Sequence, residues 1–406
     1  APGTTARVGG ISYDPRPPPP PPVSPLRIAL FTGNYNHIED GVSRTLGRLV
    51  GSLERQGHQV MVLGPTIDEP LDQPGTFVAV PSISAPGRPE YRVSTRFPAS
   101  TRREVERFAP HIVHIATPDV LGHRALAWAR GLGIPVVSTY HTHFASYLDY
   151  YGLGLAEGAL WATLRRFYNR CNEVYAPAPT MRDALLEHGV TSTVRLWPRG
   201  IELDRFHPEA RSAEWRYAVG ASDDDVVVSF VSRLVKEKGV DIFAHVGRTL
   251  AAEGVPVRAV IVGDGPERVA LADELPEAAF LGHQSGEDLT TAYASSDIFL
   301  FPSETETFGN VTLEAMASGL AVVAADAAGS ASLVDDEMTG LLCPPRDRTA
   351  FVDATRRLAL DADLRHRLGA NARQAATAYD WAEVLARMVT YYRGATESGQ
   401  SGKTGG

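Results

Sequence analysis

Short apolar runs alternate with amphipathic segments along most of the chain. The runs are rich in β-branched residues and have few polar positions, which is typical of strands buried on both faces of a parallel sheet. In the first half they are Leu26–Thr32, Val60–Leu63, Ile112–Ile115, Pro135–Thr139 and Glu173–Ala176. Segments with apolar residues at helical spacing lie between them, for example Val42–Arg55 and Thr180–Glu187. This alternation predicts a doubly wound α/β domain.

The alternation begins again after Pro198-Arg199-Gly200. Its strand-like runs are Val226–Val231, Val257–Val262, Ala279–Leu281, Ile298–Phe301, Ala321–Ala324 and Gly340–Leu342. We therefore expect two Rossmann-like domains, residues 26–200 and 201–378, with a cleft between the carboxyl ends of their sheets, where ligands of such folds bind. Residues 1–25, with the proline run Pro17–Pro22, and the Gly/Ser-rich residues 398–406 are predicted to be disordered.

The composition of the 406-residue chain is that of a globular protein, with 44% hydrophobic and 21% charged residues. The sequence has no uncharged apolar stretch approaching the ~18 residues of a membrane span, and its start lacks the pattern of a signal peptide. Its two cysteines, Cys171 and Cys343, have no ligand-like spacing, so neither a disulfide framework nor a zinc site is predicted. We expect a soluble or peripheral cytoplasmic protein.

Charge is distributed unevenly along the chain. Residues 1–200 carry 20 Arg, no Lys and 16 acidic residues, a net charge of +4, whereas residues 201–406 have a net charge of −13 and the whole chain −9. The acidic total argues against general nucleic-acid binding. The basic first half suits anionic lipid headgroups or phosphorylated substrates, although simple drift of surface residues produces the same asymmetry.

The most informative segment is Phe301–Gly319, which reads FPSETETFGNVTLEAMASG. A strand ends at Phe301, a polar loop holds Glu306, and Gly309 precedes a helical run that contains Glu314. Glycine at a helix start lets backbone N–H groups approach an anion, and the helix N-terminus adds roughly half a positive charge. A loop carboxylate and a helix carboxylate would then flank a bound phosphate. The alternative is that Glu314 is only a helix acid favoured by the dipole.

This segment resembles the E-x7-E motif of retaining glycosyltransferases of family 4, which have the GT-B fold. Three further segments match motifs of the family in order: STYHTHF at 138–144, SRLVKEKGVD at 232–241 and IVGDGPER at 261–268. The likeness spans residues 26–395, and four ordered motifs are far more specific than one. The family architecture also implies that a helix within residues 379–397 crosses back to the first domain.

The resemblance implies a site for a nucleotide-diphospho-sugar donor. Breaking the sugar–phosphate bond leaves a diphosphate whose developing charge must be neutralised. Arg233 and Lys238 would supply two cations at this leaving group, one as a planar fork and one as a point charge. Without the surrounding match, these residues would be interpreted as part of a solvated loop.

Further roles follow residue by residue from the same resemblance. Glu314 should bind the ribose hydroxyls, and Glu306 the hydroxyls of the donor sugar. The distal phosphate or the sugar should meet the backbone of Phe308, Gly309, Asn310 and Val311. The base should meet Gly282, His283 and Gln284. The alternative for this last stretch is an ordinary turn.

The first domain contributes His141, which follows the predicted strand Pro135–Thr139 and which the family places against the donor sugar. A strand-end histidine is more often structural, but the carboxyl edge of a sheet is where function concentrates. Gly41 could bring backbone N–H groups to a phosphate. The family usually has two adjacent glycines there, whereas this chain has Asp40-Gly41.

We predict no metal ion and no cofactor besides the donor. The D-x-D of Asp223–Asp225 is interpreted as a solvated turn, because it precedes a strand away from the other motifs. Arg233, Lys238 and a helix N-terminus can do the work of a cation. The chain also lacks a G-x-G-x-x-G fingerprint, which argues against a dinucleotide-dependent oxidoreductase.

Two basic segments of the first domain are candidates for contact with an anionic membrane. One is residues 88–107, with six arginines, and the other is residues 160–170, in which Trp161 and Phe167 alternate with three arginines. A basic face that bears aromatic side chains can sit on an anionic bilayer. The same spacing is typical of any helix that packs on a core.

We expect a retaining glycosyltransferase that moves a hexose from a UDP- or GDP-linked sugar to a hydroxyl acceptor, such as a glycolipid or lipid-linked precursor. The resemblance implies a front-face mechanism, which we expect to be metal-independent. We expect a cytoplasmic protein that is peripheral at the inner face of the membrane. Two alternatives are open. A nucleotide-sugar epimerase would need acid/base pairs around the sugar ring, and the match at residues 232–241 argues against it. A non-catalytic nucleotide-sugar sensor would bind without turnover, which the joint presence of the site residues disfavours.

Overall fold

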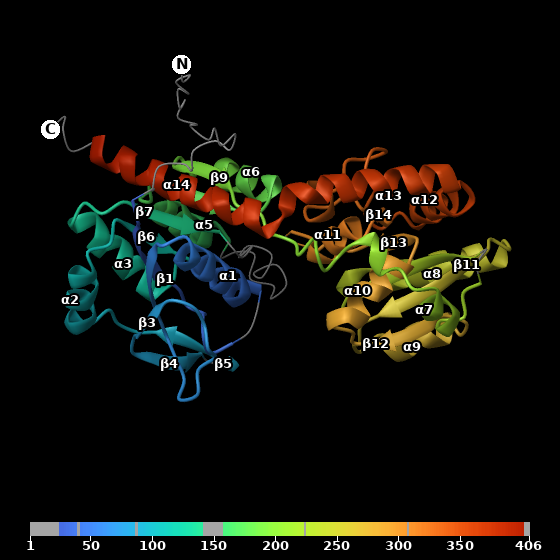
Figure 1. Ribbon diagram of the computed structural model, residues 1–406, viewed down its shortest axis with the longest axis horizontal. Coiled ribbons are helices and arrows are strands. Elements are labelled where there is room, and N and C mark those ends of the chain that lie inside the picture. Colours follow the sequence, from blue (N-terminus) through green and yellow to red (C-terminus); the bar gives the residue numbers. More distant parts are fainter. Residues whose placement is uncertain are drawn as a thin grey trace, which may run out of the picture.

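The computed structural model describes residues 24–38, 41–85, 88–140, 157–222, 225–306 and 308–401. These residues form two α/β halves that lie next to each other along the long axis of the molecule (Figure 1). Each half contains a parallel sheet flanked by helices, as the alternation of apolar runs predicts.

The first sheet has seven parallel strands in the order β3-β2-β1-β6-β7-β8-β9 within the described residues. The strands are β1 (Arg27–Phe31), β2 (Gln59–Gly64), β3 (Thr76–Ala79), β6 (Ile112–Ile115), β7 (Val136–Thr139), β8 (Glu173–Ala176) and β9 (Thr193–Leu196). Its helices are α1 (Gly41–Arg55), α2 (Ala99–Phe108), α3 (Val120–Gly131), α5 (Glu157–Tyr168) and α6 (Pro179–Glu187). The strand order reverses between β1 and β6, which is the switch point where such sheets bind ligands.

The edges of the first sheet differ from the sequence prediction. Strands β3 and β9 were not predicted, and neither was the antiparallel hairpin of β4 (Ser82–Ala85) and β5 (Arg88–Ser94). Every residue of β9 is exposed or half-buried, and three of the four residues of β3 are as well. Short edge strands therefore lack the apolar run that identifies a central strand.

The second sheet has six parallel strands in the order β12-β11-β10-β13-β14-β15. They are β10 (Val226–Val231), β11 (Val257–Val262), β12 (Ala279–Gly282), β13 (Ile298–Phe301), β14 (Ala321–Ala325) and β15 (Gly340–Cys343). The helices are α7 (Ala213–Ala218), α8 (Val240–Ala252), α9 (Arg268–Glu274), α10 (Gly286–Ser295), α11 (Asn310–Ala317), α12 (Arg348–Leu360) and α13 (Ala362–Ala376). All six strands are where the sequence predicts them, and the switch point lies between β10 and β13.

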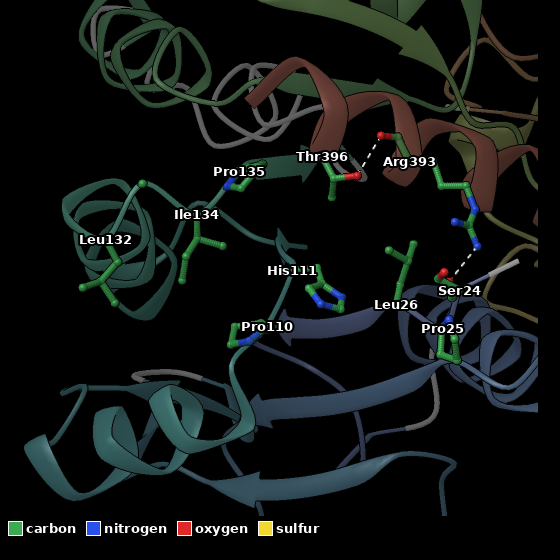
Figure 2. A pocket seen from close by; sticks show the side chains of 11 residues that line it. Ser24, Pro25, Leu26, Pro110, His111, Leu132, Ile134, Pro135, Arg393 and Thr396 are labelled. Atoms are coloured by element: carbon green, nitrogen blue, oxygen red, sulfur yellow. Dashed lines mark hydrogen bonds between the residues drawn. The ribbon is translucent and has the colours of Figure 1, made fainter. Parts of the chain in front are cut away.

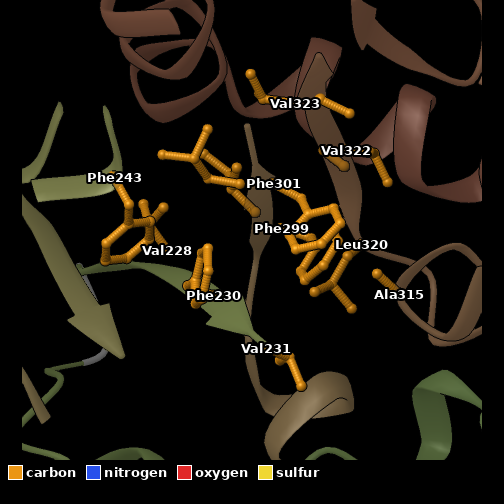
Figure 3. Close-up of a cluster of buried hydrophobic side chains, with 14 of the residues drawn as sticks. Val228, Phe230, Val231, Phe243, Phe299, Phe301, Ala315, Leu320, Val322 and Val323 are labelled. Carbon is orange, nitrogen blue, oxygen red and sulfur yellow. The ribbon is translucent and has the colours of Figure 1, made fainter. Parts of the chain in front are cut away.

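The core of the second domain fixes that switch point. Every residue of β10, β13 and β14 is buried, because helices cover both faces of the sheet. The ring centroid of Phe301 lies 5.8 Å from that of Phe230 and 5.5 Å from that of Phe299. Figure 3 shows these rings packed with Phe243 and the valines of β14. Each fully buried ring contributes ~2–3 kcal/mol, so the strand ends are held in a rigid frame.

The last helix, α14 (Trp381–Ser401), runs from the junction of the two halves along the first domain (Figure 1). Its apolar side, from Val384 to Ala395, is buried in one cluster with the first sheet. The Tyr392 hydroxyl lies 2.7 Å from His114 Nδ1, and His114 Nε2 lies 2.5 Å from Thr139 Oγ1. Burial lowers the pKa of His114 to about 3, so this imidazole is a neutral hydrogen-bonding link.

The helix α14 also corrects the predicted start of the C-terminal tail. Residues 398–401, which the sequence predicted to be disordered, continue the helix, and Ser398 Oγ donates to the carbonyl of Gly394 at 2.9 Å. Ser and Gly are poor helix formers. The preceding turns are nevertheless anchored by buried side chains such as Ala395, and tertiary packing overrides the local propensity.

Candidate active site at the junction of the two domains

Two loops meet at the switch point of the second sheet. Strands β10 and β13 are parallel neighbours, so their carboxyl ends open into adjacent loops. Lys238 lies in the first loop and Glu306 in the second, and Lys238 Nζ is 2.5 Å from Glu306 Oε1. Lys238 Nζ also donates to Thr305 Oγ1 at 3.4 Å. The topology thus brings together an ammonium and a carboxylate that are 68 residues apart in sequence.

The turn at residues 263–266, which reads GDGP, braces the loop that carries Arg233 and Lys238. The amide of Leu234 donates to the carbonyl of Asp264 at 2.9 Å, and the carbonyl of Leu234 accepts from the amide of Glu267 at 3.0 Å. Gly263 has φ 131°, and a Cβ added there would lie 1.8 Å from the carbonyl oxygen of Ser232. A glycine is therefore required for this close approach of two backbone segments.

Helix α11 follows Gly309, which has a positive φ of 92°. Glu314 in its second turn is half-buried, and its Oε2 accepts a hydrogen bond from the Tyr293 hydroxyl at 2.9 Å. Burial raises the pKa of Glu314 to about 7, although the hydrogen bond from Tyr293 and the charges of Arg205 and Arg44 favour the carboxylate. The group therefore changes its charge near neutral pH, and added cations or hydroxyl donors would ionise it.

A cleft of ≈ 560 Å³ lies between the two halves, with Glu314 in its wall. The first domain contributes one face of α1, residues Gly41, Arg44, Thr45 and Arg48. The second domain contributes the start of α11 and the loop from His283 to Ser285. The linker from Arg199 to Phe206 and Trp381 of α14 complete the lining.

Ion pairs within the linker tie the two walls of this cleft together. Glu202 Oε1 lies 2.9 Å from Arg48 Nη2 of α1, and Glu202 Oε2 lies 3.4 Å from Arg205 Nη1. Arg205 in turn donates to the carbonyl of Gly286, the first residue of α10, at 3.3 Å. One carboxylate in the linker thus connects the first domain with the second.

The cleft and the switch point account for most of the predicted site residues. The cleft lining includes Gly41, His283, Gln284, Asn310, Val311 and Glu314. Arg233 is exposed at the start of the loop that holds Lys238. Gly282, with φ 68°, ends β12 directly before the cleft-lining loop. His141 lies outside the described residues, so its predicted role stays a prediction.

Two predicted residues have a packing role as well. Phe308 is 3% exposed and its ring packs edge-on against Tyr379, so this residue is part of the core, and its predicted backbone contact with the ligand stays a prediction. At Gly41, a Cβ would lie 2.5 Å from Arg199 Nη1, which donates to the carbonyl of Gly41 at 3.2 Å. Glycine at the start of α1 therefore gives Arg199 room beside the helix N-terminus.

The sequence analysis missed the charged residues of the first wall and the linker. These are Arg44, Arg48, Arg199, Glu202 and Arg205. In a chain with 36 arginines, a single arginine carries no signal. The signal that could have found two of them is the spacing of Arg44 and Arg48 after Gly41, because residues four apart share one helix face.

The aromatic side chains of residues 160–170, one of the two candidate membrane segments, are buried. Trp161, Leu164 and Phe167 are at most 6% exposed and belong to the core of the first domain, while Arg165 and Arg166 are exposed. The alternative stated above is correct, since an amphipathic helix buries its apolar side. The described residues also contain no helix with an apolar stretch long enough to cross a membrane.

A second cavity of ≈ 350 Å³ lies at the opposite edge of the first sheet (Figure 2). It is lined by Leu26, His111 and Pro135, each of which precedes a strand, and by Arg393 of α14, which donates to the carbonyl of Ser24 at 3.1 Å. Ligands of doubly wound sheets bind at the carboxyl edge. This amino-edge cavity is therefore separate from the candidate active site.

The described residues contain no group of three or more His, Cys, Asp or Glu side chains placed to hold a metal ion. Asp223 and Asp224 of the D-x-D lie outside the described residues. The Asp225 carboxylate accepts hydrogen bonds from the amide and the hydroxyl of Ser222, at 2.7 and 2.8 Å. Asp225 thus holds Ser222, and the interpretation of the whole D-x-D as a solvated turn stays a prediction.

The fold is that of the GT-B class of glycosyltransferases. Residues 40–205 match Glycosyltransferase Family 4 and residues 212–375 match Glycosyl transferases group 1. Over 376 residues, 90% of this chain and 97% of the relative, the chain is 35% identical to the GDP-mannose-dependent alpha-mannosyltransferase of Mycolicibacterium smegmatis. The chain belongs to glycosyltransferase family 4, as its motifs predicted.

Two further comparisons bear on the fold and on the range of relatives. The chain is 28% identical over 331 residues, 78% of this chain and 75% of the relative, to the alpha-monoglucosyldiacylglycerol synthase of Streptococcus pneumoniae. The crystal structure of Anabaena Alr3699/HepE in complex with UDP matches with a TM-score of 0.70 at 18% identity, covering 91% of this chain and 100% of that chain. The predicted GT-B fold is confirmed, and the chain is a glycosyltransferase that uses a nucleotide-sugar.

Proposed function

We propose that the chain transfers a mannosyl residue from GDP-mannose, with retention and without a metal ion, to a hydroxyl group of a glycolipid or lipid-linked precursor. The name of the Mycolicibacterium smegmatis relative, which is similar over nearly its whole length, supports the donor. The observation that carries the proposal is the contact of Lys238 with Glu306 at the switch point of the second sheet.

That contact supports donor binding because it places a cation and a carboxylate side by side. A diphospho-sugar needs a cation for its phosphates and a hydrogen-bond acceptor for its sugar hydroxyls. Lys238 and the exposed Arg233 lie on one loop and can neutralise the diphosphate. A phosphate oxygen would compete with Glu306 for Lys238, and the released Glu306 could then accept hydrogen bonds from the sugar hydroxyls. Glu314, half-buried in α11, would bind the ribose hydroxyls as a carboxylate.

In the proposed reaction, the bond between the anomeric carbon and the phosphate oxygen breaks while the acceptor oxygen forms a bond on the same face of the sugar. The acceptor proton moves to the leaving phosphate oxygen, so that the products are the mannoside and GDP. Arg233 and Lys238 stabilise the charge that develops on this diphosphate, which is the effect expected to dominate such a reaction.

A lipid acceptor has weaker support than the donor. The Streptococcus pneumoniae relative is named for a diacylglycerol product. In the first domain, α2 exposes Arg102, Arg103 and Arg107, and α5 exposes Arg165 and Arg166. Exposed arginines are attracted to anionic headgroups and would help to hold the enzyme at a membrane that contains its acceptor.

A donor screen tests the proposal. The full chain is incubated in EDTA with GDP-mannose, UDP-glucose or UDP-galactose, and released nucleotide diphosphate is measured with and without vesicles of phosphatidylglycerol that contain diacylglycerol or a glycosyl-diacylglycerol. We expect release from GDP-mannose, increased by one of the vesicles. Arg233→Ala should abolish it, whereas Lys236→Ala, an exposed cation on the same loop, should not.

Product analysis separates the remaining functions. An α-linked mannolipid supports the proposal, because the sugar in GDP-mannose is α-linked. Release from a UDP-sugar alone would contradict the proposed donor. Conversion of the donor to an epimer without release would establish the epimerase, and binding without any turnover would establish the sensor.

A further inference from the structure

The cleft between the domains contains side chains that can recognise the nucleotide base. In the proposed function, on which this inference rests, Glu314 holds the ribose, so the base lies further along the same cleft. There the loop from His283 to Ser285 faces the linker segment that carries Glu202 and Arg205. The hydrogen bond from Arg205 to the carbonyl of Gly286 shows that linker and loop are in direct contact.

Among the described residues that line the cleft, Glu202 and Glu314 are the two carboxylates. Glu314 is occupied by the Tyr293 hydroxyl and by the proposed ribose contact. Glu202 is held in place by Arg48 and Arg205, yet 37% of its side chain is exposed to the cleft solvent. It therefore has acceptor capacity for a ligand, since a carboxylate offers about four lone-pair directions.

The charge of Glu202 is maintained at neutral pH. Burial works against ionisation, but the hydrogen bond and charge of Arg48 and the charge of Arg205 lower the pKa of Glu202. The charges of Glu202 and Arg205 also influence the titration of Glu314, which places them in the electrostatic neighbourhood of the proposed ribose site.

We propose that Glu202 determines the preference for guanine, by accepting hydrogen bonds from the N1–H and the 2-amino group, while Arg205 faces the O6 acceptor. Guanine presents two adjacent donors and one acceptor along this edge, which matches a carboxylate beside a guanidinium. Uracil presents a single donor between two carbonyl oxygens, so one of those oxygens would face the carboxylate. The pair thus favours guanine and disfavours uracil.

The proposal makes Glu202 a specificity residue rather than a residue of the reaction. Its removal should weaken GDP without weakening UDP, because UDP gains nothing from the carboxylate. It should also erase the distinction between GDP and IDP, whose base lacks the 2-amino group. A site that hydrogen-bonds a ligand group discriminates strongly against the analogue without it.

Calorimetric titration of the full chain with GDP, IDP and UDP tests this. The variants are Glu202→Ala, Glu202→Gln and the matched control Asp204→Ala, an exposed linker acid outside the cleft lining. For the wild type we expect GDP to bind about tenfold more tightly than IDP, the worth of one charge-assisted hydrogen bond. In Glu202→Ala this ratio should approach one, with UDP binding unchanged or tighter, Glu202→Gln should be intermediate, and Asp204→Ala should retain the wild-type ratio.

The outcomes separate this inference from the proposed function. A GDP preference over IDP that survives Glu202→Ala, or that Asp204→Ala also removes, would overturn the role of Glu202 while leaving the donor assignment intact. A wild type that binds UDP more tightly than GDP would overturn the proposed donor itself. Equal loss of GDP and UDP in Glu202→Ala would show that the residue only holds the linker.

Discussion

The switch-point loops of the second domain and the first-domain wall of the cleft are built by different means. On the second-domain side, the loops after β10 and β11 are joined by backbone hydrogen bonds, and Gly263 lets their backbones touch. On the first-domain side, the wall consists of long side chains, such as Arg44 and Arg48 on α1, over an exposed ion pair with Glu202. Backbone contacts fix positions, whereas exposed arginines adapt at little cost.

This difference suits a two-substrate enzyme. The proposed donor site has its phosphate-binding loop in place before the ligand arrives. A preorganised charge stabilises a developing charge most strongly, because it does not have to reorganise during the reaction. The opposite wall and the linker are held by exposed side-chain ion pairs, which would permit the domains to move when substrates enter and products leave. Four substitutions test this comparison, two in the loops of the second domain, one at Glu314 in the second-domain wall of the cleft and one in the first-domain wall.

The largest effect is expected for Lys238→Ala. Removal of a preformed cation at a leaving group should lower kcat/KM for GDP-mannose by about 10²–10³. Steady-state kinetics on Lys238→Ala and on Lys236→Ala, from the same turn, provide the measurement. A loss of less than about fivefold, or an equal loss in both variants, would contradict the phosphate role.

The next effect concerns the brace of that loop. Gly263→Ala should destabilise the protein by roughly 3 kcal/mol or more, because its Cβ cannot be accommodated against the Ser232 carbonyl. Gly254→Ala is the control, since Gly254 also has a positive φ of 71° but no atom within 4 Å of the added Cβ. Its cost should be about 1 kcal/mol. If urea unfolding gave the same loss of stability for Gly263→Ala and Gly254→Ala, the contact between the two loops would not be rigid.

The third effect depends on pH. Glu314 titrates at about 7 in the folded protein and at its ordinary value of 4.5 when unfolded, so the folded state alone holds this proton between these values. Stability therefore decreases as the pH rises through that window. In the wild type this proton should lower the free energy of unfolding by about 2 kcal/mol between pH 5 and pH 8, and Glu314→Gln should remove that decrease. Unfolding by urea at both pH values checks this, with the surface variant Glu187→Gln as the baseline.

The smallest effect is expected in the adaptable wall. Arg48→Ala removes an ion pair with Glu202 whose two side chains are 42% and 37% exposed. Such pairs contribute less than about 1 kcal/mol and are screened by salt. Urea unfolding with and without about 0.5 M salt measures this contribution to the free energy of unfolding, because that ionic strength screens exposed charges. A cost above about 2 kcal/mol would show that the wall is part of the rigid frame.

The central strands and several site residues could be predicted from the sequence. Strand Val226–Val231 is buried throughout, so its apolar run matches the observed bounds. Lys238, Glu306 and Glu314 lie in segments that resemble family motifs, and the roles assigned to them stay predictions. Their contact was not predicted, since only the strand order places the loop after β10 next to the loop after β13.

The rest of the site could not be predicted because it depends on how the domains pack. Glu202 and Arg48 are 154 residues apart and meet only through the linker. The pKa of Glu314 is raised by burial and is opposed by the hydrogen bond from Tyr293, and neither effect has a signature in the sequence. The aromatic rings of α5 show that one sequence pattern can fit two structures. Their spacing suits a membrane face and a core equally, and only the packing shows that they belong to the core.

A crystal structure of the full chain with GDP is the most direct test of the central claim, that the switch point of the second sheet binds a nucleotide diphosphate. The account predicts a phosphate oxygen at hydrogen-bonding distance from Lys238 and from Arg233, with Glu306 released from Lys238 and a ribose hydroxyl on Glu314. A diphosphate bound elsewhere, with the contact between Lys238 and Glu306 intact, would contradict it.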